Sequence, residues 1–303
     1  MSAQFDTTTA QLIEFGVGFE DEQGEHYALV PIDDEIQGAL REMVVTTRGE
    51  LKEAGGRPVL YEPSEKHGGK ENLRLPLNDD FAANIRAIHE ANNLPMEPRA
   101  LSIPENVFCY FARMSDGKGH RLTAIRRATA FKGVLKNRLI QLFSDALKLV
   151  HANIFKLDRD FDLLVEGEEV QILRPIGFEY VADLEEEVCK AAPKNVKAIS
   201  KDLPFVDFTR IEFYATKHSR AARSLASIRG QRTKGIDPAR LQKACEHFNV
   251  KTKTVNGKLV VDQGSIMDFL HLMDRRLYQV ELVRDSPESY LAASRSRIKE
   301  SRT

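Results

Sequence analysis

The sequence predicts an α+β protein, with antiparallel hairpins packed by helices over residues 1–195 and a mostly helical, basic region over residues 196–303. The composition of the 303 residues, 42% hydrophobic and 29% charged, is that of a globular protein. Strand-like stretches separated by turn residues dominate the first region, and apolar residues at helical spacing dominate the second. The polar stretch at residues 193–204 is the predicted domain junction.

The first hundred residues predict a hairpin, two helices and a loop. Residues 11–32 form two β-rich stretches around a polar turn. A helix is expected to begin at Asp33, because acidic residues suit a helix N-terminus and apolar residues then recur at three and four positions. Residues 55–77 have the glycine and proline content of an exposed loop. Asn78 is predicted to cap the next helix.

The middle of the chain predicts two hairpins separated by a helix. Residues 100–128 contain two strand patterns joined at Asp116–Gly119, where two glycines suit a tight turn. Apolar residues at helical spacing predict a helix of about six turns over residues 131–150. The second hairpin is expected to turn at Gly167–Glu168. That register places five apolar residues on one face: Phe161, Leu163, Val165, Val170 and Ile172.

The C-terminal region carries three local start and turn signals. Asp237 followed by Pro238 is typical of an N-cap and first helical residue. Asn256–Gly257 is a strong two-residue hairpin turn. Ser265 and Asp268 resemble a capping box ahead of an apolar helix.

Charge is unevenly distributed along the chain although the formal net charge is only −1. The net charge is −9 in residues 1–50, +6 in residues 101–150 and +5 in residues 201–250. We therefore expect an electrostatically polarised molecule. No apolar run approaches the roughly 20 residues that cross a bilayer, and the N-terminus lacks a secretory signal, so a cytoplasmic protein is expected.

Neither the cysteines nor the common catalytic motifs indicate an active site. Cys109, Cys189 and Cys245 are far apart and lack metal-ligand spacing, so we expect them to be small buried residues in a reducing compartment. The sequence has no GxxxxGK[ST], HExxH or GxSxG motif. SDGKGHR has the residues of a phosphate loop without the spacing, and its glycines are explained by a turn. No cofactor is expected.

Four acidic residues form a weak candidate for a metal site. Asp158, Asp160, Asp162 and Glu169 match positions 1, 3, 5 and 12 of a calcium loop. However, Leu163 occupies the position that requires glycine, and a strand pattern follows in place of a helix. A solvated entry to a strand is therefore the favoured interpretation.

A metal-dependent nuclease would use Asp162 with Glu169 to hold magnesium for phosphodiester cleavage. In the predicted register, Asp162 lies opposite a residue four positions from Glu169, so the two start roughly 13 Å apart. Gln171 also stands where such sites use lysine. Both observations weigh against the nuclease hypothesis.

Two basic segments favour nucleic-acid binding. Residues 113–138 hold eight basic residues and one acidic residue, and residues 210–234 hold seven and one. Lys217, Arg220 and Arg223 are spaced to line one side of a helix, and such a face can neutralise phosphates without reading bases. The alternative is that the basic faces meet acidic protein. The helix predicted at residues 238–248, followed by a lysine-rich hairpin, is also weakly typical of a winged helix.

Five runs follow one another over residues 100–300: NVFCYFAR, FKGVLKNRLIQLF, IFKLDRDFDLLVEGEEVQILRPIGFE, AARSLASIRG and SYLAASRSRIK. Together they resemble the KwaB family, the soluble component of the bacterial Kiwa anti-phage defence system. The resemblance implies a cytoplasmic, dimeric, DNA-binding protein that acts against phage DNA with the membrane protein KwaA. Any association with the inner membrane would then come from this partner.

The charge pattern and the resemblance together predict sequence-independent DNA binding in phage defence. The predicted phosphate contacts, chosen by charge and spacing, are Lys217, Arg220, Arg223, Arg229, Arg232 and Lys234, with a second patch of Arg126, Arg127, Lys132 and Lys136. Two alternatives remain open at this point. One is the metal-dependent nuclease, and the other is a protein–protein adaptor without DNA affinity.

Overall fold

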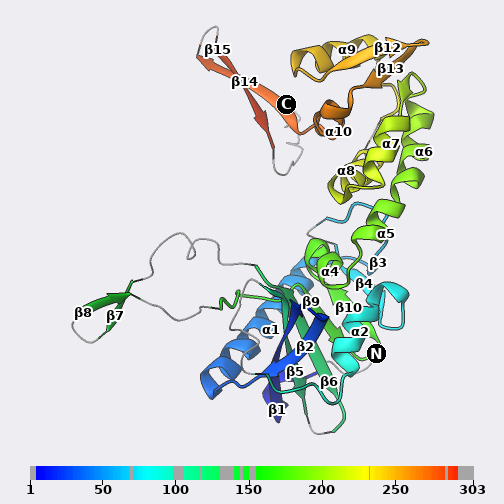
Figure 1. Ribbon diagram of the computed structural model, residues 1–303. Coiled ribbons are helices and arrows are strands. Elements are labelled where there is room, and N and C mark those ends of the chain that lie inside the picture. Colours follow the sequence, from blue (N-terminus) through cyan, green and yellow to red (C-terminus); the bar gives the residue numbers. More distant parts are fainter. Residues whose placement is uncertain are drawn as a thin grey trace, which may run out of the picture. The chain divides into compact units, whose positions relative to one another are not determined.

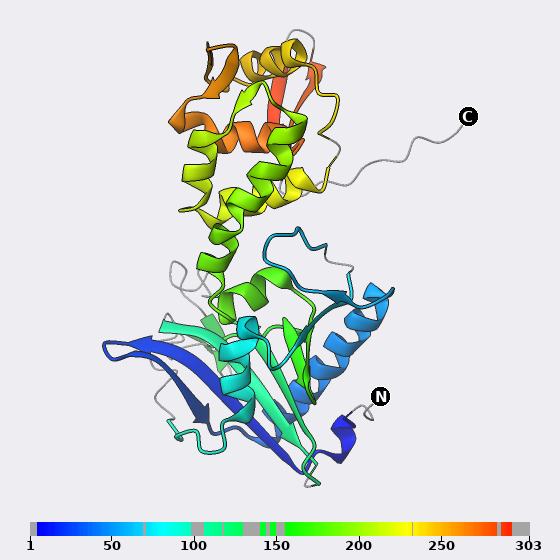
Figure 2. The same ribbon diagram turned by 90° about the vertical axis from the view of Figure 1, so that its right-hand side faces the viewer.

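The computed structural model describes residues 5–68, 71–97, 106–116, 118–129, 140–143, 146–149, 155–231, 233–283 and 286–292. It shows a mixed α and β protein with antiparallel sheets (Figures 1 and 2). The chain forms two compact units. The sheet unit comprises Met1–Tyr61 and His67–Leu184, and the helical unit comprises Glu62–Lys66 and Glu185–Thr303.

The sheet unit contains strands and helices from along its length. Its strands include β1 (Leu12–Asp21), β2 (Gly24–Val30), β3 (Val59–Leu60), β4 (Leu73–Pro76), β5 (Val107–Ser115), β6 (Arg121–Arg127), β7 (Ile140–Phe143), β8 (Ala146–Leu149), β9 (Leu163–Glu166) and β10 (Glu169–Ile172). Its helices include α1 (Asp34–Ala54), α2 (Ala83–Glu90) and α4 (Pro175–Val181), with short 3-10 turns η1 (Thr7–Thr9) and η2 (Asp80–Ala82).

Eight of these strands form one sheet in the order β2-β1-β5-β6-β9-β10-β4-β3, in which only the β3–β4 pair is parallel. The predicted hairpins β1–β2, β5–β6 and β9–β10 are confirmed. The β9–β10 register is also as predicted, because the Leu173 N–H donates to the Asp162 carbonyl at 2.8 Å beyond the Leu163–Ile172 pair. The chain thus places Asp162 just outside the sheet.

Helices cover both faces of the sheet (Figure 2). On one face, Leu40 and Val44 of α1 pack with residues such as Val17 and Tyr110. On the other face, α2 and α4 pack against a second cluster that contains Leu163, Val165, Val170 and Ile172. Phe161, which was expected with this second group, lies in the first cluster, because it precedes the strand and does not follow its alternation.

Two expectations about residues 55–80 were wrong. The expected loop contributes β3 and β4, and β4 pairs with β10 inside the sheet, so its Leu73 and Leu75 are fully buried. Pairing with a strand nearly a hundred residues away gives no local signal, which is why the loop prediction failed. The cap is Asp79, whose carboxylate accepts the Phe81 N–H at 2.9 Å, and not Asn78.

The helix predicted over residues 131–150 is contradicted where the structure describes that segment. Ile140–Phe143 and Ala146–Leu149 are the antiparallel strands β7 and β8, with Leu142 opposite Leu147 and Gln141 opposite Lys148. Short apolar runs satisfy helical and alternating patterns alike, and the Ser144–Asp145 pair is a turn-type sequence. Residues 131–139 lie outside the described part of the chain.

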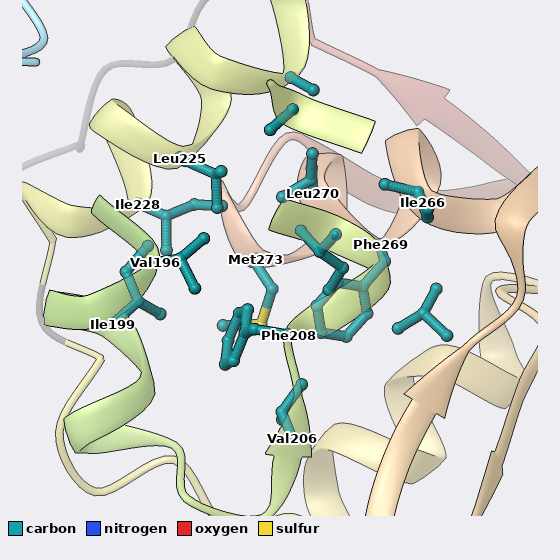
Figure 3. Close-up of a cluster of buried hydrophobic side chains, with 14 of the residues drawn as sticks. Val196, Ile199, Val206, Phe208, Leu225, Ile228, Ile266, Phe269, Leu270 and Met273 are labelled. Atoms are coloured by element: carbon teal, nitrogen blue, oxygen red, sulfur yellow. The ribbon is translucent and has the colours of Figure 1, made fainter. Parts of the chain in front are cut away.

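The helical unit is built around one apolar core. Its helices include α5 (Glu185–Lys190), α6 (Ala192–Asp202), α7 (Thr209–Ala215), α8 (Ser219–Arg229), α9 (Pro238–His247) and α10 (Ile266–Met273), with η5 (Gln263–Ser265). Its strands include β11 (Val206–Asp207), β12 (Thr252–Val255), β13 (Lys258–Val261), β14 (Leu277–Val283) and β15 (Ser286–Leu291). Figure 3 shows the core, where α6, α8 and α10 bring together Val196, Ile199, Leu225, Ile228, Ile266, Phe269, Leu270 and Met273.

The local signals of this unit mostly predicted its structure correctly. Asp237 accepts the Arg240 N–H at 2.8 Å as the N-cap of α9, and Asn256–Gly257 turns β12 into β13 with positive φ at both residues. Ser265 precedes α10 as expected, but its hydroxyl accepts the Lys251 N–H, so the predicted capping box does not form. The stretch 193–204, which was expected as a junction, lies mostly in α6, because Val196 and Ile199 pack into the core.

Two further findings concern the cysteines and the apolar character of the helices. Cys109, Cys189 and Cys245 are free and buried, as predicted. Among the described residues, no helix combines the length and the apolar character that crossing a membrane requires.

Candidate nucleic-acid interface

The basic residues predicted to line one helix do not all lie on α8. Lys217 lies in the turn before Ser219, where α8 begins, so only Arg220 and Arg223 share the predicted helix. Lys217 and Arg220 are exposed, whereas Arg223 and Arg229 are half-buried. Arg229 donates to the Asn195 side chain at 3.2 Å and lies 3.9 Å from a Glu65 carboxylate oxygen. Its charge is thus already engaged within the helical unit.

The position of α8 in the core explains why these basic side chains differ in exposure. Eight of its eleven residues are buried, including the Ala222, Leu225 and Ala226 that were expected to face inward. With so many buried residues, α8 exposes a narrower set of side chains than a surface helix does. Lys234 follows in an exposed loop, and Arg232 lies outside the described residues.

The second predicted patch is in the sheet unit, where Arg126 is enclosed by carboxylates. Its Nε lies 3.0 Å from Asp158, and its Nη1 lies 2.5 Å from Asp160 and 3.4 Å from Asp162. Arg127 is different, because its guanidinium lies over the Tyr180 ring, 3.9 Å from the centroid. Lys132 and Lys136 lie outside the described residues.

The acidic candidates for a metal site are partners of these arginines. Arg174 also donates to Asp160, at 2.7 Å, and Nε of Arg159 lies 3.7 Å from the same carboxylate, so three guanidinium groups lie at the cluster. Burial raises the pKa of Asp162, and this effect is opposed by the Arg127 N–H, at 2.9 Å, and by the guanidinium groups of Arg126 and Arg174. Burial would also raise the pKa of Asp158, but hydrogen bonds and charges from Lys156 and Arg126 hold it below its usual value.

Glu169 lies apart from this aspartate cluster in the β9–β10 hairpin. It begins β10 beside the turn, opposite Glu166, whereas Asp162 lies beyond the other end of the hairpin. Its carboxylate is 2.6 Å from Arg74 on β4. In the part of the chain that the structure describes, no group of three or more histidine, cysteine, aspartate or glutamate side chains is arranged to hold a metal ion.

Further exposed cations surround α9 and the β12–β13 hairpin. They are Arg240, Lys243, Lys251, Lys253 and Lys258. β11 adds a third strand to this hairpin, in the order β11-β13-β12. A helix followed by a hairpin with basic residues has the element order of a winged helix, although β11 pairs in parallel. The sequence predicted the helix and the hairpin, but the two-residue β11 had no signal of its own.

An exposed aromatic residue beside Lys217 was not predicted from the sequence. Phe213 of α7 is 63% exposed, and the Lys217 ammonium lies 4.2 Å from the centroid of its ring. The i to i+4 spacing of Phe213 and Lys217 is the signal that could have revealed this contact.

Comparison with known proteins identifies one family. The model of the family described as "Kiwa protein KwaB-like" matches residues 105–282. The matched segment includes the aspartate cluster, the exposed Lys217 and Arg220, and the β12–β13 hairpin. No curated protein and no solved structure matches the chain. Because the matched segment covers more than half of the 303 residues, the chain belongs to the KwaB-like family of the Kiwa anti-phage defence system.

Proposed function

We propose that this KwaB-like chain binds DNA largely without sequence specificity, as a homodimer that acts with a KwaA-like membrane protein in anti-phage defence. The observation that supports DNA binding most directly is a set of exposed cations in the helical unit: Lys217, Arg220, Lys234, Arg240, Lys243, Lys251, Lys253 and Lys258. No carboxylate of the described residues lies within 4.0 Å of these side chains. Unpaired cations can neutralise phosphates without first breaking an ion pair.

The proposed surface differs from the one that charge alone suggested. Lys217, Arg220 and Lys234 remain in the proposed set because they are exposed, whereas Arg223 is half-buried. Arg126 is left out, because three aspartates already neutralise it and its side chain is only 15% exposed. A phosphate would have to displace short charge-assisted hydrogen bonds to reach it.

Salt-dependent binding to labelled duplex DNA tests this proposal. The triple variant Lys217→Gln, Arg220→Gln, Lys234→Gln should weaken binding at moderate salt. It should also lower the slope of log K against log salt by about 0.9 for each phosphate that is no longer neutralised. The charge-matched control, Lys52→Gln, Lys118→Gln, Lys156→Gln, changes exposed lysines of the sheet unit. It should leave the slope close to that of the unmodified protein.

The same titration separates the alternatives. Equal slopes for the two triple variants would overturn the proposed phosphate contacts. Shortened DNA after incubation with magnesium would favour a nuclease, for which Asp162 and Glu169 are the first residues to replace. No affinity even at low salt would favour the adaptor, whose basic surface meets acidic protein.

A further inference from the structure

An exposed aromatic residue lies on α7. Ile211 and Ala215 of α7 are fully buried in the core of the helical unit, whereas Phe213 between them is 63% exposed. Because the ring is 63% exposed, it gains only part of the roughly 1.5–3 kcal/mol that full burial of a phenylalanine provides, and much of its surface remains available to a ligand.

The surroundings of Phe213 are cationic and aromatic. Lys217 lies over its ring, and the rings of Tyr214 and His218 contact each other in a tilted arrangement, with centroids 4.1 Å apart. Arg210, one turn before Phe213, and Arg220, three residues after Lys217, are exposed. We name Arg210, Phe213, Tyr214, Lys217, His218 and Arg220 the Phe213 surface. Glu212, half-buried, is the one acidic residue between positions 208 and 236.

We propose that the Phe213 surface binds single-stranded nucleic acid by stacking an unpaired base on Phe213 while Lys217 and Arg220 contact the adjoining phosphates. This inference rests on the proposed function and extends it from duplex DNA to unpaired strands. Proteins that bind single strands combine aromatic platforms with a cationic path for the backbone, and every base offers a face for stacking. In the interior of a duplex both faces of each base are already stacked, so the ring would add nothing to binding there.

Charge complementarity favours this ligand over an apolar protein segment. The surface offers one exposed ring beside three cationic side chains, and no described carboxylate pairs with Lys217 or Arg220. An apolar partner would bury these cations without compensation, which costs several kcal/mol per charge. A polyanion with flat apolar rings along its length suits both features.

Base stacking on position 213 can be tested by fluorescence, because the chain contains no tryptophan. Phe213→Trp would introduce the single tryptophan of the protein and retain a stacking platform. We expect a 12-residue thymidine oligomer to quench its fluorescence and a 12-base-pair duplex to leave it nearly unchanged at equal occupancy. The matched control is Tyr278→Trp, because Tyr278 on β14 is also exposed, at 47%, and should respond to neither. A uridine oligomer distinguishes RNA from DNA, and quenching by either supports stacking.

Phe213→Ala completes the experiment. It should weaken binding of the thymidine oligomer by about 10-fold or more, as expected for the loss of one base stack, and leave duplex binding unchanged. Duplex binding without quenching by single strands would overturn this inference and leave the proposed function intact. Equal loss of duplex and single-strand affinity in Phe213→Ala would also overturn it. Single-strand quenching in a protein that fails to bind duplex would support the inference while refuting the duplex part of the proposed function.

Discussion

Replacing Arg126 by glutamine should destabilise the sheet unit more than it affects DNA binding. Arg126 lies on β6, and its guanidinium joins Asp158, Asp160 and Asp162 just before β9. The side chains of Asp160 and Asp162 are 4% and 5% exposed. Without Arg126, these carboxylates would stay buried with less compensation than they have now.

The size of the effect follows from the remaining partners. Breaking a buried ion pair by removing one side costs roughly 3–5 kcal/mol. Arg174 still lies 2.7 Å from Asp160, and Lys156 still lies 2.9 Å from Asp158, so we expect the lower end, about 3 kcal/mol. The destabilisation should shrink as pH falls from 7 to 5, because the pKa of Asp162 is already raised by burial and would rise further without the guanidinium.

Amide hydrogen exchange reports on this unit separately from the helical unit. In peptides from β5 and β6, the slowest amides of Arg126→Gln should exchange roughly 100-fold faster at pH 7, since 1.36 kcal/mol corresponds to a factor of ten. Lys156→Gln is the matched control, because Lys156 pairs with the same Asp158 but its side chain is 45% exposed. Lys156→Gln should lower the free energy of unfolding by less than about 1 kcal/mol. An Arg126→Gln effect no larger than that of the control would refute the reasoning.

Three further predictions concern stability. Gly177→Ala would place a Cβ 2.2 Å from the buried Asp162 carboxylate, so we expect destabilisation by about 2 kcal/mol, measured by exchange in α4 peptides. Burial and two nearby arginines lower the pKa of His89 to about 4, below its unfolded value near 6.5. The unfolded state therefore binds more protons, stability should fall as pH drops from about 6.5 to 4, and His89→Gln should flatten that slope in urea titrations. Asp237→Ala removes the α9 cap and should cost about 1 kcal/mol in exchange of α9 peptides, whereas an unchanged rate would contradict the capping role.

Local sequence signals determined much of the fold. The β1–β2, β5–β6, β9–β10 and β12–β13 hairpins were all predicted, because each depends on turn residues and alternation within about 30 residues. The α9 cap was predicted for the same reason. Membership of the KwaB-like family was also visible as a series of runs along the chain.

The candidate site was only partly predictable. Charge counts located the basic segments but could not distinguish Lys217, which is exposed, from Arg126, which aspartates more than thirty residues away enclose. The spacing of the aspartates made them a candidate metal site. In the structure, however, they pair with guanidinium groups, including those of Arg126 on β6 and Arg174 just before α4. A count of charges contains no information about which opposite charge lies nearby.

The sequence by itself determined the hairpins, the α9 cap, the polarised charge and the family, since these depend on neighbours in the chain. Only the tertiary structure decided which cations are exposed, that β4 lies inside the sheet, and that Glu62–Lys66 joins the helical unit, where Lys66 donates to Ser227 at 2.8 Å. The physical reason is that burial and ion pairing depend on contacts between distant segments. Those contacts form only when the chain has folded.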